Sequence, residues 1–400
     1  MTYRIAFFAD SHLGYRARVK SNSNGVNVRV QDGYDALKEI TQGIIESPVS
    51  IDHVVHGGDF SHSSQPSVRD VAIGNFYLRK FYKAGIPFTG VGGNHDSSDL
   101  KSDLPAVAAF HDPDRNINMI YEPYRMMELT DGLLLHAMSH HGLHEAEAPE
   151  LKVSDDTINV FTTHGAALDP KNQTLLRCID SPREQIIPVE LITEEMFAVN
   201  LLGHYHSRYA VGNEALNTWY AGSSVRRGFT DDPGPRGWLL VEIEPNGDVK
   251  VTPQDISQRP QFDLPSIDAE ELTASEVMNL LEINLDRTHD LEKEPIVRQR
   301  VLNASRIVRE GLDYKHIETL REHTLSWQLE FPRSETNKKD VEAAASLTNR
   351  RSVNLIDNYK KFTEHAAARV PEQYREAVFK SAEDYLSQAR DLSELEGTGH

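Results

Sequence analysis

The 400-residue chain is poor in cysteine and has no long apolar run. Its single cysteine, Cys178, cannot form a disulfide within the chain, which favours a reducing compartment. No apolar stretch approaches the length of a membrane-spanning helix, and Met1 leads directly into a strand-like run without the basic and apolar segments of a secretory leader. We therefore expect a globular protein of the cytoplasm with no membrane partner.

Positive charge is also scarce. The chain has 42 Lys and Arg residues against 61 Asp and Glu residues, which gives a formal net charge of −19. This balance argues against a general nucleic-acid coat protein that binds through its bulk charge. It remains compatible with a phosphodiester substrate attracted by bound metal ions. Tight binding of DNA would then need local basic patches or a basic partner.

Five short polar motifs are present, in one order, over the first half of the chain. They are Asp10-Ser11-His12, Gly57-Gly58-Asp59, Gly93-Asn94-His95-Asp96, His164-Gly165 and Gly203-His204-Tyr205-His206. Each follows a run typical of a buried strand, at residues 5–9, 54–56, 88–92, 158–163 and 199–202. Open α/β sheets carry their chemistry at strand ends beside tight glycine turns, so the ordered set predicts one active site.

Strands and helices are predicted to alternate over residues 1–258, with helices at 31–47 and 68–84. This is the α/β pattern. Further strand signals follow the last motif at 218–221, 238–243 and 249–252, and the turn at 244–248 predicts a hairpin. Strands at both ends of the region predict two sheets packed face to face, with helices outside.

The pattern changes near Gln258-Arg259-Pro260. We predict an amphipathic helix at 268–281 with Thr273 as an internal cap, a strand at 295–304, a helix at 313–325 and a strand at 326–331. Apolar residues then recur at three- and four-residue steps over 354–386, as in amphipathic helices that either close the chain's own core or dock on a partner. The predicted domains are 1–258, 259–339 and 340–400.

The motifs together supply carboxylate, amide and imidazole donors. Such a mixed set suits two divalent ions about 3.5–4 Å apart, joined by a bridging carboxylate. Asp59 is the predicted bridge, because it ends the second strand between the first and third motifs. The other predicted donors are Asp10, His12, Asn94, His164, His204 and His206.

The charge of this set favours a phosphate ester as substrate. Two divalent ions carry four positive charges, and the carboxylates of Asp10 and Asp59 neutralise two of them. The remaining charge suits a bound hydroxide together with an anionic phosphate ester. Metal binding lowers the pKa of water toward neutrality, which provides the nucleophile for in-line attack on phosphorus.

Three further residues are expected beside the ions. His95 follows the predicted ligand Asn94 directly, so we expect it to face the substrate, where it stabilises charge or protonates the leaving oxygen. His62 is expected to support that role or to meet the substrate, and Asp96 to orient the ligands. The cluster His140-His141-x-x-His144 lacks a strand end or a carboxylate pair, so a structural or solvated role is expected.

These motifs resemble the calcineurin-like metallophosphoesterase superfamily, and within it the nuclease subunits of SbcC–SbcD-type DNA repair complexes. Many phosphatases of the superfamily have an aspartate where this chain has His62. The other segments that resemble the nuclease branch are residues 10–15 with Arg29-x-x-Asp32, residues 220–223 with Arg226, Arg227 and Phe229, and Arg259-Pro260-x-Phe262.

The resemblance implies a two-sheet metallophosphoesterase sandwich flanked by helices, followed by a small α+β DNA-capping domain and a helical C-terminal tail. It implies Mn²⁺ as the metal, although an oxygen and imidazole site also fits Mg²⁺, Fe or Zn²⁺. His95 would be catalytic. One ion would be held by Asp10, His12, Asp59 and His206, and the other by Asp59, Asn94, His164 and His204.

By the same resemblance the chain would be a DNA nuclease of repair or recombination. It would act as an exonuclease on duplex ends and as an endonuclease on single strands and hairpins. Its partners would be an SMC-like ATPase, docked on the helical tail, and a second copy of the chain. A phosphatase or cyclic-nucleotide phosphodiesterase of the same superfamily is the alternative. The basic residues that could line a DNA groove are Arg16, Arg18, Lys20, Arg226, Arg227 and Arg236.

Overall fold

The computed structural model describes residues 2–97, 104–144, 151, 153, 156–167, 186–192, 196–212, 217–288 and 291–332. Within these residues the chain forms two compact units. The first comprises Met1–Pro265, Met278–Gln299 and Asp313–Leu329, and the second comprises Ser266–Val277, Arg300–Leu312 and residues 330–332. The predicted helical tail lies outside the described residues, and the domain boundaries predicted near 258 and 339 stay predictions.

The first unit is built on two six-stranded sheets. The order in the first sheet is β14 (Val249–Asp255), β13 (Gly237–Ile243), β1 (Tyr3–Phe8), β2 (His53–His56), β3 (Phe88–Val91) and β4 (Ile117–Ile120). Strands β1 to β4 run parallel, whereas β13 pairs antiparallel with both β1 and β14. The predicted hairpin is therefore confirmed, and it closes one edge of this sheet.

The second sheet has a parallel centre and antiparallel edges. Its order is β11 (Tyr209–Ala210), β12 (Thr218–Tyr220), β10 (Val199–Gly203), β7 (Ile158–His164), β6 (Leu133–Met138) and β5 (Tyr124–Thr130). A small parallel pair, β8 (Ala166–Ala167) with β9 (Ile186–Ile187), follows β7. The short 3₁₀ helices are η1 (Ala106–Phe110), η2 (Pro113–Arg115), η3 (His140–His144) and η4 (Val189–Ile192).

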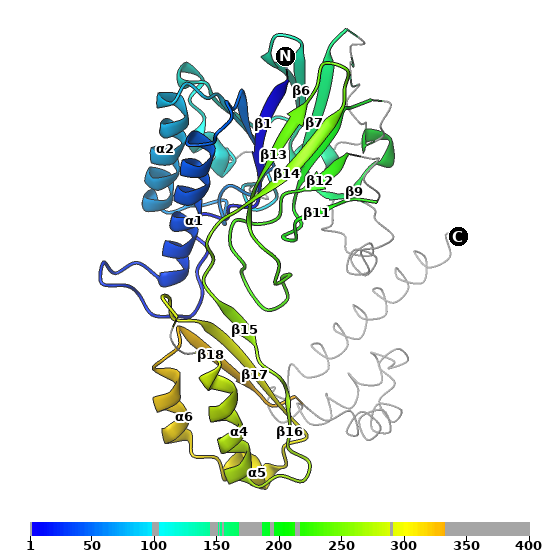
Figure 1. Ribbon diagram of the computed structural model, residues 1–400. Coiled ribbons are helices and arrows are strands. Elements are labelled where there is room, and N and C mark those ends of the chain that lie inside the picture. Colours follow the sequence, from blue (N-terminus) through cyan, green and yellow to red (C-terminus); the bar gives the residue numbers. More distant parts are fainter. Residues whose placement is uncertain are drawn as a thin grey trace, which may run out of the picture. The chain divides into compact units, whose positions relative to one another are not determined.

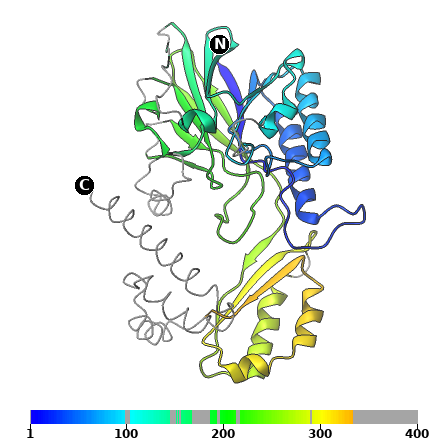
Figure 2. The same cartoon turned by 180° about the vertical axis from the view of Figure 1, so that it is seen from behind.

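Two helices cover the outer face of the first sheet. They are α1 (Val28–Ile45) and α2 (Val68–Lys83), which lie side by side in Figure 1 and again from behind in Figure 2. The side chain of Asn27 caps α1, and Ser67 forms a capping box with Asp70 at the start of α2, which satisfies main-chain donors of the first turns. None of the helices in the described ranges is long and apolar enough to span a membrane.

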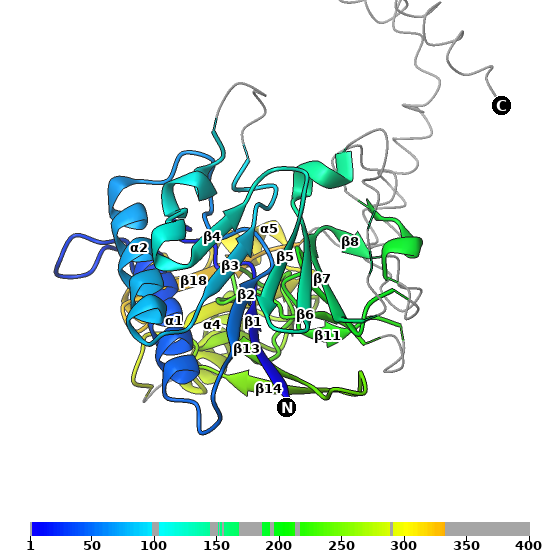
Figure 3. The ribbon, with the colours of Figure 1, turned by 90° about the horizontal axis from the view of Figure 1, so that it is seen from above.

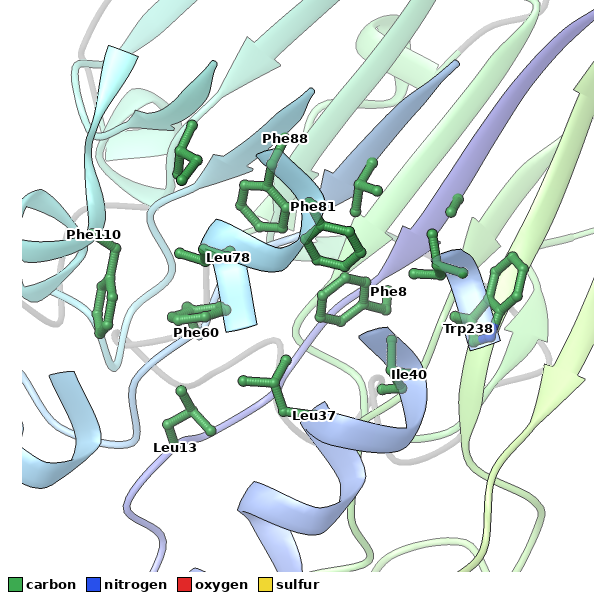
Figure 4. Close-up of a cluster of buried hydrophobic side chains, with 14 of the residues drawn as sticks. Phe8, Leu13, Leu37, Ile40, Phe60, Leu78, Phe81, Phe88, Phe110 and Trp238 are labelled. Atoms are coloured by element: carbon green, nitrogen blue, oxygen red, sulfur yellow. The ribbon is translucent and has the colours of Figure 1, made fainter. Parts of the chain in front are cut away.

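Strand β1 is buried on both faces, which explains its continuous apolar sequence. Ala6 and Phe8 belong to the core shared with the helices, and Ile5 and Phe7 belong to the core shared with the second sheet. The view from above in Figure 3 shows the first sheet between the two helices and the second sheet. Figure 4 shows the aromatic side chains packed under the helices. The predicted sandwich of two sheets with flanking helices is confirmed.

The remaining elements form a third, four-stranded sheet with short helices. The strands are β15 (Gln261–Asp263), β17 (Ile296–Leu302), β16 (Ile267–Asp268) and β18 (Ser326–Glu330), and the helices are α4 (Ala274–Asp286), α5 (Arg306–Glu310) and α6 (Tyr314–Arg321). The helix predicted from 268 is wrong at its start. Thr273 caps the N-terminus of α4, because its hydroxyl accepts from the Glu276 amide and the Glu276 carboxylate accepts from the Thr273 amide.

Candidate metal centre

The five motifs meet at one edge of the sandwich, because the parallel strands that precede them end there. Two main-chain bonds join the first and second motifs: the Asp10 amide donates to the Gly58 carbonyl at 3.0 Å and the His12 amide to the Asp59 carbonyl at 2.9 Å. The two sheets approach so closely that a Cβ on Gly203 would lie 2.0 Å from the carbonyl oxygen of Gly57. Glycine is therefore required at this contact.

Several of the predicted ligands have a left-handed backbone. The φ angles are 51° at Asp10, 43° at His12, 54° at Asp59 and 110° at His204. Residues other than glycine seldom adopt such angles, and strained positions of this kind concentrate at functional sites. The bends turn side chains from different strands toward one another.

A first cluster consists of Asp10, His12 and His206, whose ligand atoms all lie within 4.8 Å of one another. The two Nε2 atoms of His12 and His206 face each other at 3.2 Å. The Asp10 Oδ1 atom lies 3.8 Å from the first of these nitrogens and 3.9 Å from the second. The three donor atoms therefore surround a common point.

A second cluster consists of Asp10, Asp59 and His164, and it adjoins the first. The Asp59 Oδ2 atom lies 3.3 Å from the His164 Nε2 atom and 3.6 Å from the His12 Nε2 atom, so this carboxylate stands between the clusters. The Asn94 Oδ1 atom lies 3.0 Å from the His164 Nε2 atom. The His204 ring stands edge-on to the His164 ring, with centroids 5.3 Å apart.

The hydrogen bonds and charges of the second cluster suit metal binding. The His164 Nδ1 atom lies 2.9 Å from the Gly57 carbonyl, which can only accept, so Nε2 is the nitrogen available to an ion. In the protein chain alone, burial acts to lower the pKa of His164, but the carboxylates of Asp59 and Asp10 outweigh it and raise this pKa to about 9. Burial lowers the pKa of His12 well below its usual value. An ion would replace the proton of His164, and the oxygen and imidazole donors fit divalent metals.

His62 and His95 lie beside the first cluster and are half-buried. Their rings stack with centroids 5.1 Å apart, and the His95 Nδ1 atom lies 3.0 Å from the His62 carbonyl oxygen, to which it donates. The Asp59 Oδ1 atom accepts from the His95 amide at 2.8 Å. The His62 Nδ1 atom lies 3.4 Å from the Nδ1 atom of His12. Both predicted catalytic histidines therefore lie beside the predicted ligands His12 and Asp59.

Asp96 is fully buried and lies behind the predicted ligands. Its carboxylate accepts from the amides of Phe60 at 3.1 Å, Ser61 at 2.7 Å and Gly93 at 3.0 Å, and so joins the loop of Asp59 to the loop of Asn94. Burial and the nearby charge of Asp59 raise the pKa of Asp96 to about 7. These contacts fit the orienting role expected of it.

Three residues that were not predicted as ligands lie near the centre, and one of them, His140, was expected to have a structural or solvated role. The Asp231 Oδ1 atom lies 3.4 Å from the His206 Nδ1 atom. The Tyr220 hydroxyl donates to the Gly165 carbonyl and accepts from the Ala167 amide, both at 2.7 Å. His140 is buried, with its Nδ1 atom 3.3 Å from the His164 carbonyl oxygen. Tyr220 carried a signal through the segment at 220–223 that resembles the nuclease branch, and His140 through the cluster His140-His141-x-x-His144, whereas Asp231 carried none.

The predicted basic groove residues do not form one set. Arg16, Arg18 and Lys20 are exposed, and Arg226 and Arg227 are half-buried. Arg236 is only 1% exposed, and its guanidinium donates to the carbonyls of His206 at 2.7 Å and Asp232 at 2.6 Å. The prediction that Arg236 lines a groove is wrong, because the side chain is buried and its two terminal nitrogens donate to main-chain carbonyls inside the protein.

The comparisons with known proteins point to one family. A family model described as calcineurin-like phosphoesterase matches residues 3–239. A Haloferax volcanii protein named DNA double-strand break repair protein Mre11 is 25% identical over 268 residues, which cover 64% of this chain and 53% of that protein. The proteins of the same name from Methanosarcina acetivorans and Sulfurisphaera tokodaii are 35% identical over 94 residues and 22% identical over 221 residues.

The chain thus spans about half the length or less of these relatives. The alignment covers 24% of this chain and 14% of the Methanosarcina protein, and 51% of this chain and 49% of the Sulfurisphaera protein. The family model, in contrast, covers more than half of this chain and includes all five motifs. The chain therefore belongs to the calcineurin-like phosphoesterase family.

Proposed function

We propose that the chain is a metal-dependent DNA nuclease with a dinuclear centre. The observation that carries this proposal is the position of Asp59, whose Oδ2 atom stands between His12 and His164 where two donor clusters adjoin. A carboxylate in that place is what two neighbouring divalent ions require. Asp10, His12, Asp59 and His206 would hold one ion, and Asp59, Asn94, His164 and His204 the other.

When bound, the two ions would lower the pKa of a water molecule and stabilise charge on the phosphate. The chain's own residues would perform the remaining steps. His95 donates from Nδ1 to the His62 carbonyl, so its Nε2 atom is the one that would carry a proton to the leaving oxygen. His62 would hold the His95 ring by stacking, and Asp96 would keep the loops of Asp59 and Asn94 together.

DNA is proposed as the substrate because the similar proteins from three archaea are named for DNA double-strand break repair. The segments at 10–32 and 220–229 support the same branch of the family. We propose Mn²⁺-dependent exonuclease activity on duplex ends and endonuclease activity on single strands and hairpins, in DNA end processing and recombination. The oxygen and imidazole donors suit Mn²⁺.

The test compares substrates on one preparation. Full-length protein with Mn²⁺ is incubated with labelled duplex, single-stranded and hairpin DNA, beside bis(p-nitrophenyl) phosphate, p-nitrophenyl phosphate and a cyclic nucleotide. Cleavage of DNA that EDTA abolishes is expected. Turnover of only the small substrates would refute the nuclease proposal and favour a phosphatase or cyclic-nucleotide phosphodiesterase.

An SMC-like ATPase of the SbcC type is the proposed protein partner, docked on the apolar face of residues 354–386, and the active form is proposed to be a homodimer. A basic partner would supply DNA affinity that a net charge of −19 does not favour. A truncation after Lys339 should keep Mn²⁺-dependent cleavage of single-stranded DNA and fail to co-purify with the ATPase. If this truncation binds the ATPase as well as the full chain does, the tail is not the docking element.

A further inference from the structure

The turn after β12 brings a guanidinium to the metal centre. The Arg227 Nη2 atom lies 2.8 Å from the Nε2 atom and 3.1 Å from the Nδ1 atom of His206. His206 is a proposed ligand of the first ion, and His12 meets it at 3.2 Å. Arg227 therefore stands at the edge of the first cluster, on the face of a ligand ring.

This position is fixed by contacts on both sides of the Arg227 main chain. The Tyr15 hydroxyl donates to the Arg227 carbonyl at 2.9 Å, and the Arg227 amide donates to the Asp231 Oδ2 atom at 2.8 Å. The other oxygen of Asp231 lies beside His206 at 3.4 Å. The preceding residue is held as well, since Gln261 donates to the Arg226 carbonyl at 2.8 Å. The turn presents the Arg227 side chain in a defined place.

The two neighbouring arginines point to different surroundings. The guanidinium of Arg226 lies 5.6 Å from the centroid of the Phe229 ring and donates to the Gln261 carbonyl at 3.4 Å. That of Arg227 lies against the His206 ring, 2.8 Å from its Nε2 atom and 3.1 Å from its Nδ1 atom. Within the described residues, Arg227 forms no ion pair with a carboxylate, because the oxygens of Asp231 are directed to a main-chain amide and to His206.

The charges gathered here attract a further anion, because the carboxylates of Asp10 and Asp59 neutralise only two of the four charges that two divalent ions would carry. The positive guanidinium of Arg227 would repel divalent ions held by His206 and the neighbouring donors. An anion placed between the guanidinium and the ions would be attracted by both. A phosphate oxygen suits this place, because the planar fork of arginine binds phosphate through paired N–H donors.

We propose that Arg227 binds a non-bridging oxygen of the phosphate that occupies the metal centre, and so acts on the scissile phosphate itself. The inference rests on the proposed function in one respect, that divalent ions occupy this centre. In this arrangement Arg227 adds the positive charge of a side chain to the charges of the ions, on the side of the His206 ring. The ligand class is a phosphate or phosphate ester, whatever nucleotide sequence or strand carries it.

The test measures phosphate binding without catalysis. Full-length protein loaded with Mn²⁺ is titrated with inorganic phosphate by calorimetry, and bound manganese is determined by elemental analysis. Removing one charge-assisted hydrogen-bond donor should weaken phosphate binding about 10- to 100-fold in Arg227→Gln, with bound manganese unchanged. Arg227→Lys keeps the charge but loses the fork, so it should bind phosphate roughly 3- to 10-fold more weakly than the natural chain. Arg79→Gln, which removes an equal charge from the exposed face of α2, is the matched control and should bind phosphate normally.

The proposal is overturned if Arg227→Gln binds phosphate within about threefold of the natural chain, or if that variant loses manganese. If Arg227→Gln does not fold, an unchanged phosphate affinity in Arg227→Lys overturns it equally. Absence of phosphate binding by the natural, manganese-loaded chain would also overturn it. DNA cleavage measured in parallel separates the two proposals: a chain that binds phosphate through Arg227 and cleaves no DNA refutes the nuclease proposal alone.

Discussion

Replacing Tyr220 with phenylalanine removes one hydroxyl and the two hydrogen bonds that it makes. The hydroxyl donates to the Gly165 carbonyl and accepts from the Ala167 amide, each at 2.7 Å, and the tyrosine is fully buried. These partners belong to the segment that follows His164 directly. Phenylalanine fills the same space apart from one oxygen, so the change tests these bonds with little loss of packing.

The expected loss of stability follows from the two main-chain groups that lose their hydrogen-bond partner. A buried donor or acceptor without a partner costs about 1–3 kcal/mol, and here one carbonyl and one amide are affected. Allowing for partial relaxation, we expect the free energy of unfolding to fall by about 2–4 kcal/mol. For a domain of this size that corresponds to a decrease in melting temperature of roughly 4–16 °C.

The measurement is urea unfolding of Tyr220→Phe beside the natural chain, both with EDTA. Tyr82→Phe is the matched control, because Tyr82 is 45% exposed on α2, and its unfolding free energy should change by no more than about 0.5 kcal/mol. Manganese affinity should also fall in Tyr220→Phe, since the segment after His164 loses its support. A Tyr220→Phe variant as stable as Tyr82→Phe would refute the reasoning.

The remaining predictions concern the histidines and Asp59. His95→Ala should lower cleavage by at least about a hundredfold with both ions still bound, whereas Asp59→Ala should lose metal; elemental analysis beside the DNA assay decides, and an emptied centre in His95→Ala would contradict its assignment. Burial lowers the pKa of His53 to about 3. Below pH ~6.5 His53 is protonated in the unfolded chain but stays neutral in the folded chain. His53 should therefore lower the free energy of unfolding by about 1.4 kcal/mol per pH unit as the pH falls from ~6 to ~4. Urea unfolding of His53→Gln should show a correspondingly flatter pH dependence. Because the pKa of His164 is about 9 before metal binds, manganese binding at pH 7 should release about one proton. Calorimetry in two buffers of different ionisation enthalpy measures this release, and equal heats would contradict it.

The central strands could be predicted because local sequence determines them. A strand buried on both faces favours apolar side chains along its length. β1 has a continuous run from Ile5 to Phe8, whereas β2 and β7 have the shorter pairs Val54-Val55 and Val160-Phe161 before their motifs. Parallel strands end at the same edge of a sheet, so the order of the motifs was enough to place their side chains together. The start of α4 was predicted wrongly although its signal is local, in the Thr273-x-x-Glu276 capping box.

The identity of the donors also follows from the sequence, but their partners do not. The Asn94 side chain meets that of His164, which is 70 residues away, and the Asp231 side chain meets that of His206, which is 25 residues away. Arg236 and Arg227 are alike in sequence, yet one is buried under the His206 main chain and the other reaches the His206 ring. Only the folded chain distinguishes them.

The sequence by itself thus determined which elements form and which chemical groups stand at their ends, because hydrophobic periodicity and glycine turns act over a few residues. The tertiary structure decided which groups touch. Asp59 stands between His12 and His164 because the two sheets pack closely at Gly57 and Gly203, a contact between residues far apart in the chain. Distances of this kind are set by the packing of whole layers, which short stretches of sequence do not encode.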